Sequence, residues 1–491
     1  MLSLLLLTPL IGAVLVGLAP VRNGNWLRHI AVTTALLALL QALRVWWHFD
    51  PAGDLQFAES RTWNPRLGSA FSIAVDGVSL AMVLLATLLF LLALLSFKVP
   101  RSSSRLYFLL MLLLETAVLG VFTARDWSLF YVFWELTLIP LFFLIDRLGG
   151  SQCQRAALNF VLYTMGGSVF MLVALLLLYD ASPGHSFDML AMAAGGRSLP
   201  VDAQVAIFLG LFVGFAVKMG VFPLHGWMPL VYSEAPGAVP LISSGILLKM
   251  GAYGILRAVS TLPGAAEALK TQLAVLAFAS MLYGALLAWR SRNLIIMATY
   301  ASMSHMAVVL LGIATLSGVG TTGAVMQMLG HGFAAGLLFL LLGLLGERIG
   351  SRDVDRFVGL QQRMPRFSIF LIAALLGSVG LPGTIGFVGE LHVIVAGYAR
   401  WGGWVALVSL AVVIAASYAL RIINQLLTNQ GTAALQPGAP LIIRDLGHSE
   451  IWAASLLLFG MLGLGFLPAP ALSLVSGTAR QIELLLAWGA S

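Results

Sequence analysis

The chain has 491 residues, of which 60% are hydrophobic and only 10% are charged, and its formal net charge is +7. A soluble domain carries about 25% charged residues, so this composition excludes a water-soluble globule and indicates a membrane protein. Cys153 is the only cysteine, which excludes a disulfide framework and a cysteine-ligated metal or iron–sulfur site within this chain. The basic residues are dispersed rather than clustered with aromatics, so we expect no nucleic-acid partner.

Apolar blocks recur along the whole chain. A membrane-spanning helix needs roughly 20 apolar residues, and the sequence predicts an all-α polytopic membrane protein with about 14 such spans. They lie near residues 2–19, 28–47, 73–97, 106–123, 128–146, 156–179, 204–222, 240–259, 271–289, 294–316, 321–345, 367–387, 404–427 and 451–467. We interpret the first block as a retained span because it lacks the basic start of a cleaved signal peptide. Residues 471–488 are expected to form a short amphipathic helix.

The Lys and Arg residues in the connections between spans predict the orientation. The odd-numbered connections hold 16 of these residues and the even-numbered connections hold 8. Because cytoplasmic connections carry the excess of positive charge, the odd-numbered connections are expected to face the cytoplasm. With an even number of spans, both termini are then expected on the periplasmic side.

Two predicted spans are interrupted at matching places in the two halves of the chain. The seventh is interrupted at 220–223 (GVFP) and continues over 223–235, and the twelfth is interrupted within 380–390 (GLPGTIGFVGE) and continues over 388–399. Proline removes a backbone donor, and a break at membrane depth is tolerated only where it lines a cavity or packs against protein. Paired breaks are typical of inverted-repeat transporters. Two ordinary proline kinks are the alternative interpretation.

The paired breaks predict two inverted five-helix repeats, formed by helices 4–8 and 9–13, with an ion path near both breaks. The corresponding domain organisation has four parts. Residues 1–104 form the N-terminal helices 1–3, residues 105–262 the first repeat, residues 263–430 the second repeat, and residues 431–491 helix 14 with the tail.

Charged side chains occur inside several of these apolar spans. A charge at the bilayer centre costs about 2.5–3.5 kcal/mol, so residues that carry one are expected to have a function. The four that we assign to a proton relay are Glu135, Lys218, Lys249 and Glu390. Burial favours the neutral form of a lysine and a nearby carboxylate favours its charged form, so such a row can load and release a proton. We predict Glu135 as the partner of Lys218, Lys249 as the next relay, and Glu390 as the exit group.

Three histidines and one further acid extend the predicted row. His225, His305 and His331 lie near the same depth, and histidines titrate close to neutral pH, so they can bridge gaps between charged groups. Glu115 is the remaining candidate. For these four residues a structural role remains open: the histidines can be packing residues, and the acid can be a structural hydrogen-bonding group.

Structural interpretations also remain open for the central charges. Glu135 and Lys218 can form a static ion pair that holds two helices together. Lys249 can extend to the membrane interface, since Arg257 lies two turns further along. Asp76 is expected to cap the third helix and to lie outside the path.

Six long stretches carry a family resemblance. They are LFYVFWELTLIP (129–140), FAVKMGVFPLHGWMP (215–229), EAPGAVPLISSGILLKMGAYGILR (234–257), YASMSHMAVVLLGI (300–313), HGFAAGLLFLLLG (331–343) and LPGTIGFVGEL (381–391). Together they resemble the antiporter-like subunit M of respiratory complex I, the proton-pumping NADH:quinone oxidoreductase, and the resemblance runs through nearly the whole chain. The wider superfamily includes Mrp-type sodium/proton antiporters and membrane-bound hydrogenases. The acid Glu390 after the second break favours the M type.

The resemblance implies a proton channel built from two inverted repeats. In it, Glu135 and Lys218 correspond to the input pair, Lys249 to the central lysine and Glu390 to the exit acid. It also implies that this chain binds no cofactor, since FMN, the iron–sulfur clusters and quinone are expected in partner subunits. The expected partners are other membrane-arm subunits, protons and the lipid bilayer, in an energy-transducing membrane such as the bacterial inner membrane.

The chain departs from the family pattern at three places. Asn159 stands where the family usually has a lysine, Leu230 lies within a segment that is usually LPDAH, and residues 293–300 lack the usual acidic and basic residues. These departures suggest a diverged M-type subunit or one with another electron input.

Three functions follow from the sequence. The first is a proton-translocating subunit of a redox-driven pump. The second is a cation/proton antiporter subunit (Mrp-like) or the membrane subunit of a related hydrogenase-type complex. The third is a structural spacer with a closed path. Glu390, where antiporter subunits usually have a lysine, argues against an antiporter, and the intact row of four charges argues against a spacer.

Overall fold

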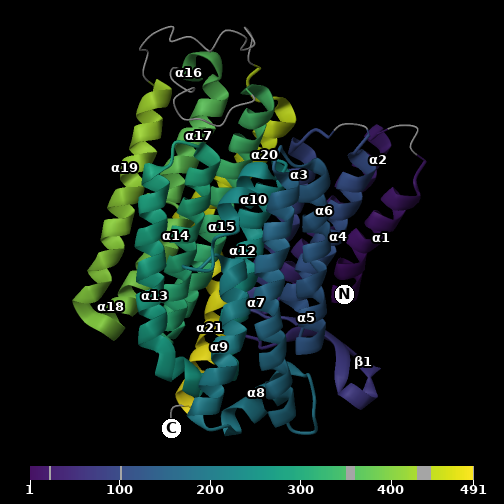
Figure 1. Cartoon of the computed structure of the whole chain (residues 1–491), viewed down its shortest axis with the longest axis vertical. Coiled ribbons are helices and arrows are strands. Elements are labelled where there is room, and N and C mark those ends of the chain that lie inside the picture. The colour runs from purple at the N-terminus through teal and green to yellow at the C-terminus, as the bar shows by residue number, and fades with distance from the viewer. Residues whose placement is uncertain (21–23, 100–101, 350–359, 428–443, 490–491) are drawn as a thin grey trace.

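The protein is a bundle of long helices with one small β-hairpin at its lower end (Figure 1). The computed structural model describes residues 1–20, 24–99, 102–349, 360–427 and 444–489. The predicted domain boundary at residues 430–431 and the loop arginines Arg22, Arg101, Arg352 and Arg356 lie outside these ranges.

The first half of the chain contains the hairpin and the first interrupted helices. Its elements are α1 (Leu2–Leu18), α2 (Gly24–Trp47), β1 (Gln56–Asn64), η1 (Pro65–Leu67), β2 (Ser69–Val75), α3 (Gly77–Ser96), α4 (Ser104–Thr123), α5 (Trp127–Leu136), α6 (Leu138–Leu148), α7 (Cys153–Ala181), α8 (Met189–Ser198), α9 (Val201–Met219), α10 (Met228–Glu234), α11 (Ala238–Ile242), η2 (Ser243–Leu247) and α12 (Leu248–Thr261).

The elements of the second half that the structure describes are all helices. Its elements are α13 (Pro263–Arg290), α14 (Leu294–Ala314), α15 (Gly318–Ile349), α16 (Leu360–Arg363), α17 (Pro365–Ser378), α18 (Ile385–Trp401), η4 (Gly402–Ala406), α19 (Leu407–Leu427), α20 (His448–Phe466) and α21 (Ala469–Gly489).

The predicted number of membrane spans agrees with the structure. Within the described residues, 12 segments are long and apolar enough to cross a membrane, and two shorter apolar helices, α1 and α17, add to them. Together they account for the fourteen predicted spans. The tail helix α21 also forms where it was predicted, and it packs against α15 and α3.

Several boundaries and elements differ from the prediction. The third span was predicted from residue 73, but residues 69–75 form strand β2, and α3 begins only after Asp76 caps it with its side chain. The antiparallel hairpin β1–β2 and helix α8 were not predicted. The fifth span is divided at Thr137 into α5 and α6, and the eighth contains a π-helical turn, η2.

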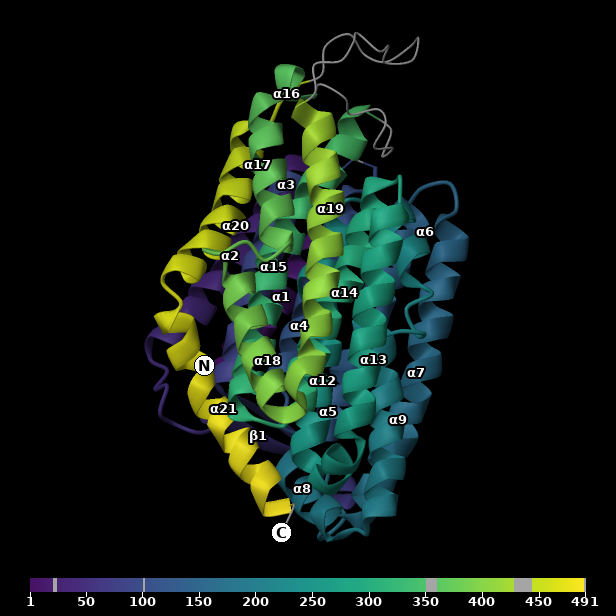
Figure 2. The ribbon, with the colours of Figure 1, turned by 90° about the vertical axis from the view of Figure 1, so that its left-hand side faces the viewer.

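Both predicted helix breaks are present, and the two broken helices run in opposite directions. α9 ends at Met219 and α10 begins at Met228, while α17 ends at Ser378 and α18 begins at Ile385. In Figure 1, α9 lies below α10, whereas α17 lies above α18, and Figure 2 shows the same descent from α17 to α18. Gly220 and Gly380 follow the first segment of each pair with nearly equal positive φ angles of +78° and +79°. A positive φ is costly for any residue with a Cβ. Both breaks therefore use a glycine in the same left-handed backbone conformation.

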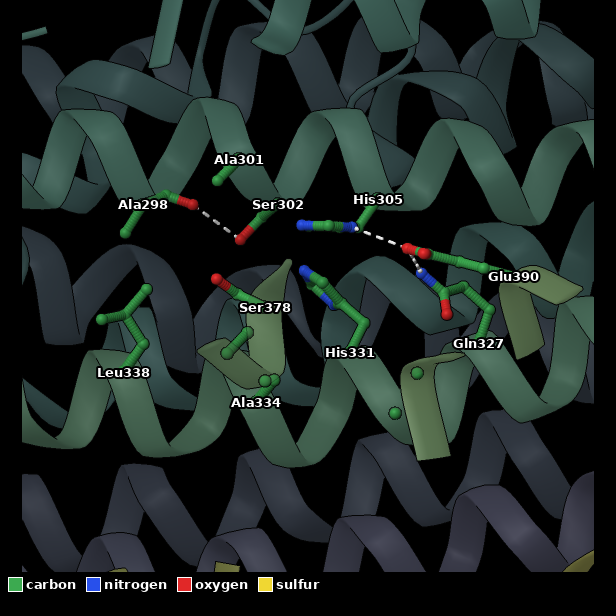
Figure 3. Close-up of a pocket in the computed structure, with 14 residues that line it drawn as sticks. Ala298, Ala301, Ser302, His305, Gln327, His331, Ala334, Leu338, Ser378 and Glu390 are labelled. Atoms are coloured by element: carbon green, nitrogen blue, oxygen red, sulfur yellow. Dashed lines mark hydrogen bonds and ion pairs between the residues drawn. The ribbon is translucent and has the colours of Figure 1, made fainter. Parts of the chain in front are cut away.

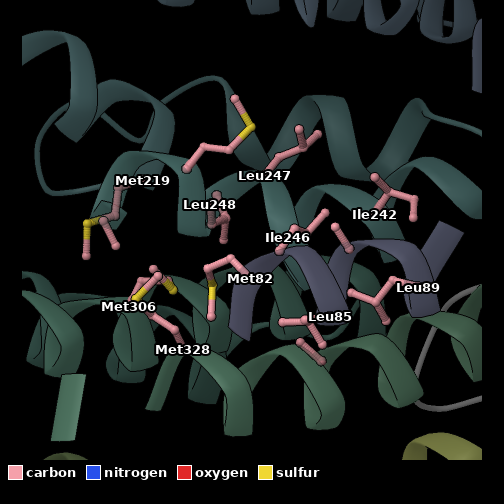
Figure 4. Close-up of a cluster of buried hydrophobic side chains, with 14 of the residues drawn as sticks. Met82, Leu85, Leu89, Met219, Ile242, Ile246, Leu247, Leu248, Met306 and Met328 are labelled. Atoms are coloured by element: carbon pink, nitrogen blue, oxygen red, sulfur yellow. The ribbon is translucent and has the colours of Figure 1, made fainter. Parts of the chain in front are cut away.

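A buried hydrophobic cluster fills the centre of the bundle (Figure 4). Its members come from α3, α9, α11, η2, α12, α14 and α15, and they include Met82, Leu85, Leu89, Met219, Ile242, Ile246, Leu247, Leu248, Met306 and Met328. Small residues allow the close approach, since Gly245 lies against Leu89 and Gly332 against Leu85. Helices in lipid associate mainly through such packing. Leu248, one of its members, directly precedes the buried Lys249.

Candidate functional site

Close packing of α15 on α18 builds the site of the second repeat. Glycines lie on both sides of this contact, because a Cβ on Gly330 would meet the backbone of Gly386 and a Cβ on Gly389 would meet the backbone of Gln327. Glycine at such positions lets two helix backbones approach closely. The contact brings side chains of α15 directly against Glu390 of α18.

Glu390 is buried and has two polar partners. Gln327 Nε2 donates a hydrogen bond to Glu390 Oε1 at 3.1 Å, and His305 Nδ1 of α14 lies 3.5 Å from the same oxygen. The other oxygen, Oε2, lies against Gly380 at the helix break, where any Cβ would collide with it. The carboxyl group therefore has one oxygen toward the histidines and the other toward the break.

Lys249 is fully buried and is held by a π-helical turn and a histidine. Its Nζ donates to the backbone carbonyl of Ser244 at 2.5 Å and lies 2.5 Å from His331 Nδ1. Ser244 belongs to η2, whose wider i→i+5 turn lies immediately before Lys249. Lys249 therefore does not extend to the membrane interface.

The imidazoles of His331 and His305 connect the lysine to the acid. Their ring centroids are 5.8 Å apart, and Figure 3 shows a ring nitrogen of His331 directed toward the ring of His305. His305 Nε2 and His331 Nε2 are buried and have no hydrogen-bond partner among the described residues. Both rings line a cavity of about 20 Å³, together with Ser302, Ser378 and Glu390. About 10–15 Å³ is enough for one water molecule, so a water can bridge the rings.

The hydrogen-bond directions define which nitrogens can carry protons. When Lys249 is an ammonium group it is a donor only, so His331 Nδ1 then accepts and the neutral ring carries its proton on Nε2. When Glu390 is ionised it accepts only, so a proton on His305 Nδ1, 3.5 Å from Glu390 Oε1, leaves Nε2 as the acceptor of that ring. The series Lys249–His331–His305–Glu390 therefore has donors and acceptors in one consistent order. A proton that leaves the lysine can arrive at the acid if each imidazole changes tautomer.

Lys218 forms a separate group in the first repeat. It lies in the last turn of α9, and its Nζ donates to Thr137 Oγ1 at 2.7 Å, at the junction of α5 and α6. The aromatic rings of Trp134 and Phe160 lie 5.1 Å and 5.9 Å from this nitrogen, within the range of a cation–π interaction. No hydrogen bond or ion pair between described residues joins this group to Lys249.

The predicted contact between Glu135 and Lys218 is wrong as a direct ion pair. Thr137, two residues further on, is the residue that Lys218 contacts, and Glu135 Oε1 has no hydrogen-bond partner among the described residues. A helix advances 100° per residue, so residues two apart point in different directions. The alternative of a static ion pair between Glu135 and Lys218 is likewise not observed.

Glu115 and His225 lie outside both groups. Glu115 is fully buried in α4, and neither of its carboxylate oxygens makes a hydrogen bond to a described residue. The structure therefore does not support a structural hydrogen-bonding role for Glu115. His225 lies in the irregular segment between α9 and α10, and its ring contacts those of Tyr283 and Tyr300 at 5.3 Å and 6.2 Å. The ring of His225 therefore faces α13, which carries Tyr283, and α14, which carries Tyr300. The helix resumes only at residue 228.

Asp76 caps α3 as predicted and also pairs with two arginines. Its carboxylate accepts from the Ser79 N–H and lies 2.5 Å from Arg257 and 3.2 Å from Arg125. Burial alone would raise the pKa of Asp76, but the guanidinium groups of Arg257 and Arg125 hold this pKa well below its usual range. The cluster fixes the end of α12, the helix that carries Lys249 and Arg257.

Sequence reasoning missed three polar residues of the site: Thr137, Ser244 and Gln327. A usable pattern existed only for Gln327, which lies four residues before His331 and therefore on the same face of a helix. Thr137 and Ser244 are common residue types in membrane helices, and only the tertiary contacts reveal them.

Comparisons with known proteins agree with this fold. A family model described as NADH:quinone oxidoreductase/Mrp antiporter, TM, matches residues 124–415. NAD(P)H-quinone oxidoreductase chain 4 2 of Thermosynechococcus vestitus is 35% identical, over 98% of this chain and 91% of that protein.

Solved structures show the same similarity. A chain of respiratory complex I from Thermus thermophilus with bound NADH has a TM-score of 0.89 and 30% identity, covering 99% of this chain and 100% of that one. A chain of the Mrp complex from Dietzia sp. has a TM-score of 0.86 and 21% identity, covering 98% and 97%. The second similarity shows the fold alone.

Proposed function

Because this chain belongs to the NADH:quinone oxidoreductase/Mrp antiporter family of transmembrane proteins, we propose that it is a proton-translocating subunit of a redox-driven NAD(P)H:quinone oxidoreductase of the complex I type. The observation that carries the proposal is the buried series Lys249–His331–His305–Glu390. Buried charged groups in a membrane span mark ion paths. A series with one order of donors and acceptors is suited to protons, which can pass through imidazole tautomers.

The proposal assigns a role to each charged group. Lys218, with Thr137 as its contact and Glu135 nearby, takes up the proton of the first repeat. Lys249 receives a proton in the second repeat, His331 and His305 pass it on, and Glu390 releases it at the break before α18. Glu115 and His225 are secondary members, because no contact joins them to these groups.

Electron transfer belongs to partner chains in this proposal. The single cysteine, Cys153, cannot supply the ligands of a cysteine-bound iron–sulfur cluster, so flavin, clusters and the quinone site are assigned to other subunits. The excess of Lys and Arg in the odd-numbered connections supports an orientation with both termini on the periplasmic side of a bacterial inner membrane. Lateral contacts with other membrane-arm subunits would couple this chain to the redox reaction.

Proteoliposomes that contain the whole complex test the proposal with Glu390→Gln. We expect quinone reduction to continue when the membrane is uncoupled, while the ratio of protons pumped to electrons transferred falls. An unchanged ratio would reject the proton path. Sodium-dependent proton movement without any electron donor would instead support the Mrp-like alternative.

A further inference from the structure

Gln327 has an unusual environment for a buried glutamine. Its side chain projects from α15 one turn before His331 and contacts Glu390, and only 2% of the residue is exposed. Its Nε2 donates to Glu390 Oε1 at 3.1 Å. Its own Oε1 is buried and accepts no hydrogen bond from any described residue. Leaving a buried acceptor unpaired is destabilising, so simple packing does not explain an amide here.

A second buried glutamine in the same chain provides the comparison. Gln204 Nε2 donates to the carbonyl of Leu199 at 2.9 Å, and Gln204 Oε1 accepts from the N–H of Gly264 at 3.0 Å. Both ends of that amide are satisfied, as expected for a structural glutamine. Only the donor end of Gln327 has a partner in the state that the structure shows.

The chemistry of Glu390 explains the free acceptor. An ionised carboxylate only accepts hydrogen bonds, whereas a protonated carboxyl group also has an O–H to donate. An amide offers two N–H donors and one carbonyl acceptor on the same carbon. The terminal torsion of glutamine is broad and roughly two-fold, so a half turn presents either end to the same neighbour.

The position of Glu390 explains why the Gln327 amide would need to present either its donor or its acceptor end. One carboxyl oxygen faces Gln327 and His305, and the other lies against Gly380 at the helix break. A proton that arrives from His305 must be held until it leaves toward the break. A partner that stabilises only the ionised form would oppose the arrival of the proton.

We propose that Gln327 is a positioning residue that holds Glu390 in both protonation states. Its NH₂ group donates to the ionised carboxylate, and after a half turn its carbonyl Oε1 accepts the O–H of the protonated acid. The residue exchanges no proton itself. This inference rests on the proposed proton path and adds a two-state contact at its exit.

Infrared difference spectroscopy on the whole complex tests the inference. The C=O band of protonated Glu390 is the band that disappears in the Glu390→Gln variant. We expect Gln327→Met, which has a similar volume and no amide, to move this band to higher wavenumber, because the acid loses its hydrogen-bond acceptor. We also expect the proton-to-electron ratio to fall. Gln204→Met is the matched control and should change neither readout.

The outcomes separate this inference from the proposed function. If Glu390→Gln leaves the proton-to-electron ratio unchanged, the proposed function itself fails. If Glu390→Gln lowers the ratio while Gln327→Met leaves both the band and the ratio as in the wild type, only the role of Gln327 is overturned. Should Gln327→Met not assemble, Gln327→Asn, whose amide is one methylene shorter, is expected to shift the same band, and an unshifted band would equally overturn the inference.

Discussion

Lys249 has two acceptors that differ in what they can do with its proton. The carbonyl of Ser244 accepts a hydrogen bond but cannot be protonated under physiological conditions, whereas the Nδ1 atom of His331 can take the proton. The carbonyl therefore positions the ammonium group, and the imidazole provides its route onward. In the proposed path these two contacts set the direction of transfer.

Asp76 illustrates a buried charge whose role is structural. Arg257 and Arg125 both depend on its carboxylate for charge compensation. Removing one partner of a buried ion pair costs about 3–5 kcal/mol, because a charge is left uncompensated. We expect Asp76→Asn to lower thermal stability in detergent by an amount in this range. Asp445→Asn, at a half-buried loop contact with the start of α17, is the control and should have a smaller effect.

The same pair of contacts predicts a dependence of stability on acid. The pKa of Asp76 is depressed in the folded protein, so its contribution is fully present above the ordinary aspartate pKa of about 3.9. It is lost as the pH falls below that value toward the folded-state pKa. Unfolding measured against pH should show an acid-sensitive contribution that Asp76→Asn removes. Equal acid sensitivity of the wild type and Asp76→Asn would contradict this role.

At the scale of elements, the first segments of the two broken helices end in the same way. Gly220 and Gly380 both have φ near +80° and both are followed by an irregular segment. At the second break the glycine also makes room for the Glu390 carboxylate. At the second break, Gly380 therefore sets both the backbone conformation and the space for the Glu390 carboxylate.

Gly380→Ala should disturb both properties. A left-handed conformation costs an alanine about 1–2 kcal/mol, and the added Cβ would displace Glu390 Oε2 from its place. We expect the complex to assemble with a reduced proton-to-electron ratio. Gly403→Ala, where an added Cβ meets no atom within 4 Å, is the control and should pump normally. A normal ratio in Gly380→Ala would show that the carboxylate is not held against the break.

The elements also show where sequence reasoning succeeds and where it stops. Both breaks were predictable, because proline disrupts a helix and glycine weakens one, and the two residue types occur together at residues 220–223 and 380–383. The π-helical turn η2 was not predictable, since its one glycine, Gly245, does not by itself indicate a wider turn within residues 243–247. The hairpin was missed because the apolar strand β2 reads as the beginning of the third span.

In the candidate site, the charged residues could be predicted from the sequence, but most of their contacts could not. The buried charges were visible in the sequence because each interrupts an apolar run. Thr137 and Ser244 were not visible, because spacing along one chain segment does not specify contacts between helices, whereas Gln327 has a helical spacing of four residues from His331. For this reason Lys218 was paired with Glu135 when its contact is Thr137.

At the scale of the whole molecule, the charged groups divide into two sets. Lys218 and Thr137 form one set in the first repeat, and Lys249, His331, His305 and Glu390 form the other. Met219 and Leu248, the neighbours of the two lysines in sequence, both belong to the hydrophobic cluster in Figure 4. We infer that a proton passes between the sets only when the α9–α12 contact rearranges or takes up water. Coupling to a redox reaction elsewhere would act on this contact.

The most direct test of the account is the number of protons pumped per electron by the whole complex with Lys249→Met in this chain. Methionine keeps most of the side-chain volume and removes the proton-carrying group. The account predicts a lower ratio with uncoupled electron transfer retained, while Lys270→Met, at a partly exposed ion pair with Glu267 on α13, leaves the ratio unchanged. A wild-type ratio in the Lys249→Met complex would contradict the account.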